Sequence, residues 1–377
     1  MGVNVSRRMI MGSALLGAAG LAASGCVQGE ANAPQAASSH LPANLFGPPP
    51  GAAQLSRNEN PYGPSPRVLA AVADATRAGA YYADTSYLAA MIAEKNGVEP
   101  SQVVLSTGSA EALCATALAF GAQGAILCPS LFWDTTALYA AQKGATLKRV
   151  PLTADLQIDL PAMEAAVGGD VALVHLCNPN NPTGTLLDSG ALRGFCERVS
   201  TKAPVLVDEA YNELTSDPEG NSMLNLVRAG NNVIVARTFS KIYGMAGMRI
   251  GYMITTPENA ELIRSYVMSW MSAPSIAAAV ASYNDEDFLA YSKSKVTEAR
   301  EMVSAAVTGA GLTHLPSETN FMYVRVDDAD AMQAAMAERG VFIRPAYGDF
   351  THWSRVSMGK IEDVERYVGA LPEIVGA

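Results

Sequence analysis

The sequence predicts an α/β protein built on a mostly parallel central sheet. Short apolar segments such as 125–128, 171–176 and 204–207 alternate along the chain with amphipathic helical patterns. Several of these segments end directly in polar or glycine-rich turns, as expected where parallel strands present ligand-binding loops at one edge. With 377 residues, 49% of them hydrophobic, the chain can bury a large core. The length fits one large α/β domain plus a smaller one, or two ordinary domains.

The composition argues against two classes of function. The formal net charge is -10 and the pI about 5.0, and no basic cluster occurs beyond the N-terminus, which argues against nucleic-acid binding. Five cysteines and four histidines show no metal-ligand spacing, so no metal site is expected. The sequence leaves open whether any pair among Cys114, Cys128, Cys177 and Cys196 forms a disulfide, although their settings favour small buried side chains.

The first 26 residues are expected to be a targeting segment. Ser6–Ile10, with its two arginines, resembles a twin-arginine export motif, and an apolar run that is too short for a transmembrane helix follows it. The run ends in Ala-Ser-Gly-Cys26, which resembles a lipoprotein cleavage box. We therefore expect an exported, periplasmic protein with a possible membrane tether through lipidated Cys26. Residues 27–55 are rich in Ala, Pro, Ser and Gly and predict a flexible linker.

The rest of the chain divides into three predicted parts. Residues 56–84 are polar and turn-forming and are expected to be an N-terminal arm. Residues 85–265, with alternating helices and strands, predict a large cofactor-binding domain. Residues 266–377 begin with long helices and then alternate short strands with helices, which predicts a smaller α/β domain.

A lysine follows one of the predicted strands. Residues 232–237 are apolar, Thr238 and Ser240 come next, and Arg249 lies eight residues beyond Lys241. An amine beside hydroxyls and a guanidinium suits a cofactor that carries both an aldehyde and a phosphate, because the amine can form a Schiff base while the others hold the phosphate. An arbitrary Ser-Lys pair would more often be a solvated loop, so the assignment depends on partners elsewhere.

Three such partners occur at the ends of other predicted strands. The turn at 107–111 opens a helix, and the amides of Ser109, Ala110 and Glu111 could hold a phosphate, although an ordinary helix cap is the alternative. Asn181 lies in a rigid Asn- and Pro-rich loop. Asp208 ends an apolar strand, where a carboxylate is costly unless it meets a cation or a donor such as a protonated ring nitrogen.

Together these motifs resemble the fold-type I pyridoxal phosphate-dependent aminotransferases of class I/II, most closely the histidinol-phosphate aminotransferases. The resemblance covers roughly residues 55 to 375, and its motifs occur in the family's order. These motifs are Asn58–Pro64 in the arm, Asn181–Gly184, Asp208–Tyr211, Ser240–Tyr252, the pair Asn320-Phe321, and Arg355. The resemblance implies the type I fold, with a large domain on a mostly parallel sheet and a smaller C-terminal domain.

The resemblance also implies roles for individual residues. Lys241 would form the internal Schiff base and move a proton, while Asp208 would pair with the ring nitrogen. Arg355 and Asn320 would meet the substrate carboxylate, and Tyr82 would reach the phosphate of a neighbouring subunit in a homodimer. Asn181 and Tyr211 would contact the phenolic oxygen, and the phosphate would be held by Ser109, Ala110, Glu111, Thr238, Ser240 and Arg249. Substrate preference would depend on residues such as Tyr62, Arg57 and Arg344.

One position departs from the family pattern. The aromatic side chain that stacks on the cofactor ring is expected where this sequence has Leu131, and Phe132 and Trp133 follow. Counting back from Gly144 assigns Trp133 to the stacking position, provided that a two-residue insertion precedes it.

The favoured interpretation is an enzyme that transfers an amino group from an amino acid or related amine to a 2-oxo acid. A decarboxylase, lyase or racemase that uses the same cofactor is the alternative. An envelope scaffold lipoprotein without chemistry would be expected to lack Lys241, Asp208 or Asn181, and the sequence has all three. Because histidine biosynthesis is cytoplasmic, the export signal favours a different substrate.

Overall fold

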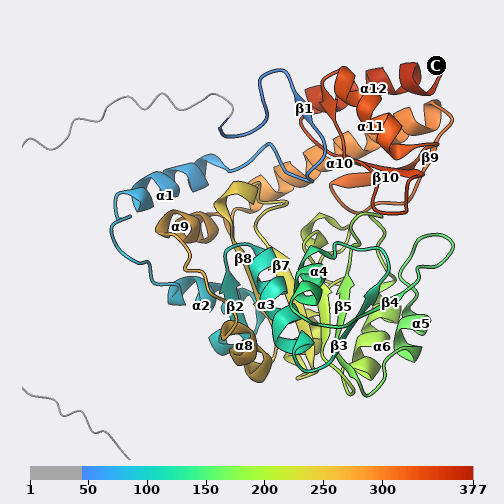
Figure 1. Ribbon diagram of the computed structural model, residues 1–377. Helices are drawn as coiled ribbons and strands as arrows, with labels where there is room; N and C mark the ends of the chain where they lie inside the picture. Colours follow the sequence, from blue (N-terminus) through green and yellow to red (C-terminus); the bar gives the residue numbers. More distant parts are fainter. Residues whose placement is uncertain (1–44, 377) are drawn as a thin grey trace, which may run out of the picture. The chain divides into compact units, whose positions relative to one another are not determined.

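The computed structural model describes residues 45–376, and residues 47–377 form one compact unit (Figure 1). The predicted export signal, including Cys26, and most of the predicted linker lie outside the described residues. None of the helices within residues 45–376 is both long and apolar enough to cross a membrane.

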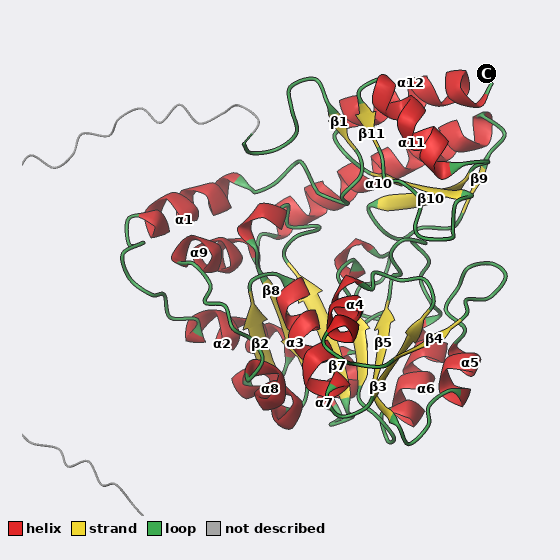
Figure 2. Ribbon diagram, viewed as in Figure 1, coloured by secondary structure: helices red, strands yellow, loops and turns green. Residues whose placement is uncertain are grey.

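The elements follow one another as the alternating pattern predicted (Figure 2). The strands are β1 (Ala53–Gln54), β2 (Val103–Ser106), β3 (Ala125–Pro129), β4 (Leu147–Val150), β5 (Val171–Cys177), β6 (Val205–Asp208), β7 (Val233–Thr238), β8 (Gly251–Ile254), β9 (Thr313–His314), β10 (Phe321–Arg325), β11 (Val341–Phe342) and β12 (Trp353–Ser357). The helices are α1 (Pro66–Thr76), α2 (Ser86–Asn96), α3 (Ser109–Gly121), α4 (Thr135–Gln142), α5 (Leu160–Ala165), α6 (Ser189–Val199), α7 (Leu224–Arg228), α8 (Pro257–Arg264), α9 (Ala273–Ser282), α10 (Glu286–Gly309), α11 (Ala329–Glu338) and α12 (Ile361–Val375).

A seven-stranded sheet forms the centre of the larger part, in the order β2-β8-β7-β6-β5-β3-β4. Only β8 runs antiparallel to its neighbours. Side chains alternate between the two faces, so Leu206 and Ile234 pack with α3 while Val205 and Val233 join the core on the other side. Because both faces are covered, the inner strands are apolar almost throughout, and only their ends are free to carry polar side chains.

The C-terminal part has its own three-stranded antiparallel sheet, β12-β10-β9, packed with α10, α11 and α12. A two-stranded parallel sheet joins β1 to β11. The prediction of a flexible linker over residues 27–55 is therefore wrong at its C-terminal end. Ala53 belongs to a paired strand, and Ala53 and Leu55 are both 0% exposed. The composition of the segment concealed the pairing, since the strand contributes only two residues.

The local backbone determines where β8 and β10 begin. Residues 248–250 do not extend β8, because Arg249 adopts a left-handed conformation with φ of 56° that interrupts an extended chain. β10 begins only at Phe321. Before it, the hydroxyls of Ser317 and Thr319 donate to the Phe321 carbonyl and hold residues 317–320 in a turn.

Candidate active site

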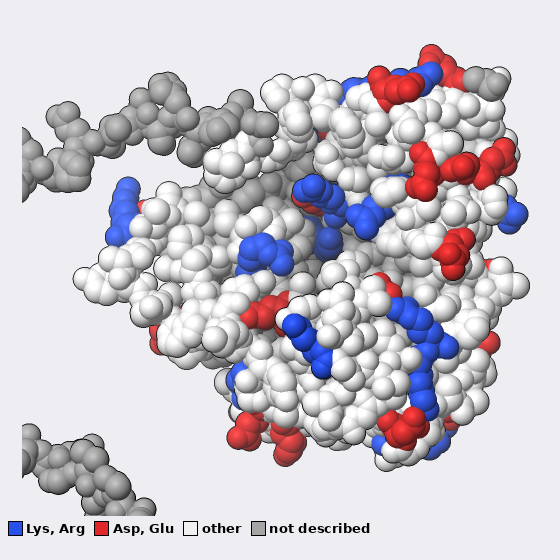
Figure 3. All heavy atoms as spheres, in the orientation of Figure 1, with Lys and Arg blue, Asp and Glu red and all other residues white. Residues whose placement is uncertain are grey.

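A cavity of about 630 Å³ opens where the carboxyl ends of β6 and β7 face the arm and the C-terminal part. The residues around it come from seven separate segments of the chain, which include the arm, the start of α3 and the 344–355 region. Lys and Arg side chains gather at a hollow in this face of the molecule (Figure 3). The position agrees with the rule that open α/β sheets bind ligands beyond the carboxyl ends of their strands.

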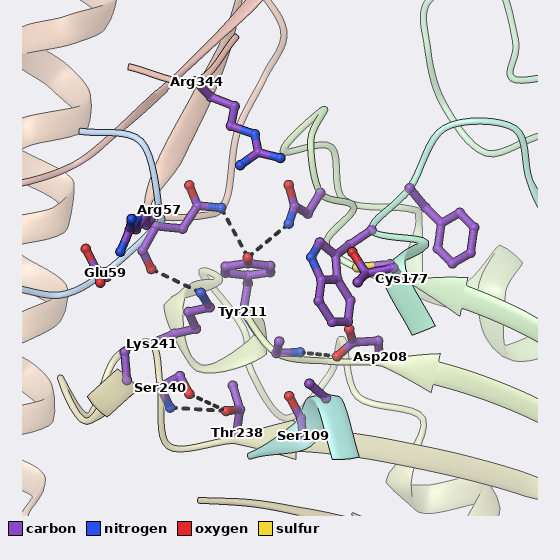
Figure 4. A pocket seen from close by; sticks show the side chains of 18 of the residues that line it. Arg57, Glu59, Ser109, Cys177, Asp208, Tyr211, Thr238, Ser240, Lys241 and Arg344 are labelled. Atoms are coloured by element: carbon purple, nitrogen blue, oxygen red, sulfur yellow. Dashed lines mark hydrogen bonds between the residues drawn. The ribbon is translucent and has the colours of Figure 1, made fainter. Parts of the chain in front are cut away.

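Lys241 projects into the cavity just after β7, and its Nζ donates to the main-chain oxygen of Asn58 at 3.2 Å (Figure 4). Burial lowers the pKa of this amine to about 8, helped by the positive charges of Arg355 and Arg249 and opposed by Glu59 and Asp208. An amine with such a pKa is far more often neutral near pH 7 than an ordinary lysine, so it can act as a nucleophile and a base.

Asp208 ends β6 with its carboxylate in the cavity wall and is only 4% exposed. Burial raises its pKa to about 7, although the Ala210 N–H at 3.2 Å and the charge of Lys241 both act to lower it. One hydrogen bond from a main-chain N–H offsets little of the cost of removing a carboxylate from water. Asp208 therefore has fewer hydrogen-bond donors around it than a buried carboxylate needs. A cationic ring N–H supplied by a ligand would complete its contacts.

The hydroxyl of Tyr211 accepts hydrogen bonds from two amide side chains, Asn58 at 3.1 Å and Asn181 at 3.3 Å. Arg355 donates to the Asn181 side-chain oxygen at 2.6 Å and to the Ser56 carbonyl at 2.7 Å. Its Nε is buried and has no hydrogen-bond partner among residues 45–376. Arg355 therefore keeps donor capacity for a carboxylate ligand.

The opposite end of the cavity carries donors that suit a phosphate. Ser109 and Ala110 open α3 there, and Gly108 has φ of 84° with the Arg249 guanidinium so close that any side chain would collide with it. The Thr238 and Ser240 hydroxyls lie 3.0 Å apart beside them. An amine, an under-partnered carboxylate and a phosphate cradle thus fit the aldehyde, ring nitrogen and phosphate of pyridoxal phosphate.

Most of the predicted site residues line this one cavity, including Trp133, which is accompanied there by Phe132. Their individual roles stay predictions. The predictions missed Tyr347 and considered Cys177 only as a possible disulfide partner, yet both residues line the cavity. The four cysteines within residues 45–376 are all free thiols.

Four predicted residues lie outside the cavity lining. The Glu111 N–H already donates to the Gly108 carbonyl, so the phosphate cradle stops at Ala110. Tyr62 accepts a hydrogen bond from the Ile361 N–H, and Asn320 donates to the Asn58 carbonyl, so both support the arm rather than face the cavity. Tyr82 is exposed and its ring contacts that of Trp270 in a tilted arrangement, with ring centroids 5.1 Å apart.

The fold and the site define a pyridoxal phosphate-dependent enzyme that acts as a transaminase. Residues 51–371 match the family described as aminotransferase class I and II, and the chain belongs to that family.

Named relatives and a solved structure agree with this. A histidinol-phosphate aminotransferase of Dechloromonas aromatica is 36% identical over 322 residues, which cover 84% of this chain and 88% of that protein. An aromatic amino acid aminotransferase of Cutibacterium acnes is 35% identical over 334 residues, 86% of this chain and 93% of that protein. The crystal structure of histidinol-phosphate aminotransferase from Sinorhizobium meliloti in complex with pyridoxal-5'-phosphate is 31% identical, covers 86% of this chain and 91% of that one, and has a TM-score of 0.79.

Proposed function

We propose that this transaminase acts on amino acids that carry a second anionic group and returns the amino group to a 2-oxo acid. The observation that carries the proposal is the set of three guanidinium groups, Arg57, Arg344 and Arg355, around the cavity that holds Lys241. Arg57 and Arg344 belong to none of the ion pairs among residues 45–376. Their charges are therefore available to a ligand.

The positions of Arg57 and Arg344 relative to Arg355 support two separate anion contacts. The main chain just before Arg57 is held by the hydrogen bond from Arg355 to Ser56, and just after it by the bond from the Asn58 N–H to Ser357. Arg344 forms a backbone bridge with Arg355. Arg355 would hold the α-carboxylate, while Arg57 and Arg344 would hold a carboxylate or phosphate at the far end of the substrate.

The other residues have roles consistent with this substrate. Bound pyridoxal phosphate supplies the aldehyde that accepts the amino group and a ring that withdraws electrons from the α-carbon. Lys241 would move the proton at that carbon, and Asp208 would keep a proton on the ring nitrogen. Asn181 and Tyr211 would orient the ring through its phenolic oxygen. The cradle residues Ser109, Ala110, Thr238, Ser240 and Arg249 would hold the phosphate.

The test is a comparison of amino donors on the purified protein loaded with pyridoxal phosphate. Aspartate, glutamate and phosphoserine should convert the cofactor's absorbance band to that of the amine form, and leucine should do so much less. Arg57→Gln and Arg344→Gln should each raise KM for the dianionic donors by roughly 10- to 100-fold, because a charge-assisted hydrogen bond contributes about 1.5–3 kcal/mol.

The exposed Arg67 of α1 gives a matched control, since Arg67→Gln makes the same change away from the cavity and should leave KM unaltered. Equal use of leucine and glutamate would refute the proposed second anion contact. Carbon dioxide or ammonia released without an acceptor would instead indicate a decarboxylase or a lyase.

We also propose that the enzyme works as an exported homodimer in which Tyr82 reaches the phosphate site of a second copy. The exposed position of Tyr82, away from its own cavity, supports this. Export by the twin-arginine route to the periplasm, and lipidation of Cys26, rest on residues 1–26 alone. Replacing Arg7 and Arg8 by lysine should retain the enzyme in the cytoplasmic fraction, and unchanged fractionation would exclude export by the twin-arginine route. Cys26→Ala should release the enzyme from membranes, and an unchanged membrane fraction would exclude lipidation of Cys26.

A further inference from the structure

The carboxylate of Glu111 joins two segments that are far apart in the sequence. Its Oε2 accepts hydrogen bonds from the Thr107 N–H and hydroxyl, both at 2.7 Å. Its Oε1 accepts from the Ser269 N–H at 2.8 Å and from the Ser269 hydroxyl. The two hydroxyls also meet each other at 3.0 Å. One side chain thus takes four donors, two from each segment.

The first of these segments begins the phosphate end of the cofactor site. Thr107 precedes Gly108, and the free amides of Ser109 and Ala110 follow at the start of α3. Gly251 packs so tightly on the Ser109 amide that a side chain at Gly251 would have no room. A small displacement of Thr107 would therefore be transmitted to the amides that hold the phosphate.

The second segment carries exposed apolar side chains. Ser269 lies between Met268 and Trp270, which are 89% and 76% exposed, and the ring of Trp270 packs at a tilt of 58° against that of Tyr82, which is 86% exposed. We call Tyr82, Met268 and Trp270 the aromatic patch. Large apolar side chains grouped in this way usually mark a protein-protein contact. The hydrogen bonds of Ser269 to Glu111 hold the patch beside the phosphate cradle.

We propose that Glu111 is a positioning residue that couples cofactor binding to the docking of a second copy of this chain on the aromatic patch. The proposal rests on the dimer of the proposed function. A second copy is the occupant that the site favours, because Tyr82 is exposed outside the lining of its own cavity and lies on the patch that Ser269 and Glu111 join to the cradle. The carboxylate of Glu111 is suited to the role because hydrogen bonds to a charged acceptor are about twice as strong as neutral ones.

Coupling of this kind works in both directions. If the cofactor phosphate orders the loop at Thr107, Glu111 passes that order to Ser269 and the patch, and the dimer becomes tighter. Thermodynamic linkage requires that dimerisation tighten cofactor binding in turn, and because the dimer has two cofactor sites, the change in its dissociation constant is the product of the changes in affinity at both sites. Coupling between sites commonly amounts to 5- to 150-fold, so we expect roughly a tenfold ratio between the dimer dissociation constants of the cofactor-free and the cofactor-loaded protein.

The experiment measures that ratio by sedimentation velocity on the full chain, with and without pyridoxal phosphate. Glu111→Gln is the test variant, because a glutamine has only one acceptor oxygen and its amide group would face donors. Glu258→Gln is the matched control, since Glu258 also lies in the first turn of a helix and is exposed without a hydrogen-bond partner within the described chain. We expect the ratio to fall several-fold in the first variant, where only the direct contact of Tyr82 with the phosphate site of the second copy would remain, and to stay near the wild-type value in the second.

A second variant keeps the proposal testable if Glu111→Gln folds poorly. Ser269→Ala retains the N–H that donates to Glu111 and removes the hydroxyl, so it should reduce the ratio only in part. A wild-type ratio retained in either folded variant would overturn the coupling. A wild-type protein that binds pyridoxal phosphate but stays monomeric would refute both the dimer and the coupling, whereas failure to bind pyridoxal phosphate would refute the proposed cofactor roles.

Discussion

Asp208→Asn tests the electrostatics of the site in the cofactor-free protein. Burial raises the pKa of this carboxyl from 3.8 to about 7. In the unfolded chain the group loses its proton near pH 4, while the folded protein retains it up to pH 7. The free energy of unfolding of the wild type therefore falls as the pH rises from about 4 to 7, by up to roughly 4 kcal/mol for a difference of about three pKa units, and is level above that range. An asparagine does not titrate and should avoid this loss.

The assay is urea denaturation of both cofactor-free proteins at pH 4.5 and pH 8, conditions chosen at about the two ends of the titration. The variant should be more stable than wild type by about 2–4 kcal/mol at pH 8 and by much less at pH 4.5. Its transaminase activity should nonetheless fall by at least about a hundredfold, because an electrostatic partner of the reacting system is lost. Equal stability at pH 8 would show that Asp208 is not a costly buried charge, and the argument that a ligand must complete its contacts would fail.

Two further substitutions examine neighbouring contacts. Arg355→Lys should raise KM for amino acids by roughly 10- to 100-fold, since an ammonium cannot bridge Asn181 and a carboxylate as the guanidinium does; an unchanged KM in steady-state assays would exclude Arg355 as the carboxylate partner. Glu209→Gln should destabilise the fold by about 1.5–3 kcal/mol, because the buried side chain of Arg237 loses the carboxylate bonded at 2.7 Å and keeps only Glu213, at 3.0 Å, as a charge partner. Urea denaturation at pH 7.5 measures this second effect, which would be contradicted by a loss of less than about 1 kcal/mol.

The chain's own patterns were sufficient to predict the α/β class, most of the strands and part of the cavity lining, whereas Arg355 and Tyr211 were assigned only through the family resemblance. This succeeded because inner parallel strands must be apolar on both faces, so any polar residue at a strand end is conspicuous. Asp208 after β6 and Lys241 after β7 are conspicuous for this reason. Sequence spacing assigned Trp133 to the stacking position; Trp133 lines the cavity together with Phe132, and its stacking on the cofactor ring stays a prediction.

The tertiary structure alone decided which groups meet and which charges are altered. Contacts across the chain, such as Lys241 with Asn58, join residues 183 positions apart, and no local pattern records them. The prediction that the Glu111 N–H binds the phosphate was wrong, because this N–H donates to the Gly108 carbonyl within the turn. The Glu111 side chain instead accepts a hydrogen bond from Ser269, 158 residues away. Local sequence thus determined which polar side chain stands at the end of each strand. Packing determined the pKa values and the donors left free, because burial and long-range pairing arise only when distant segments come together.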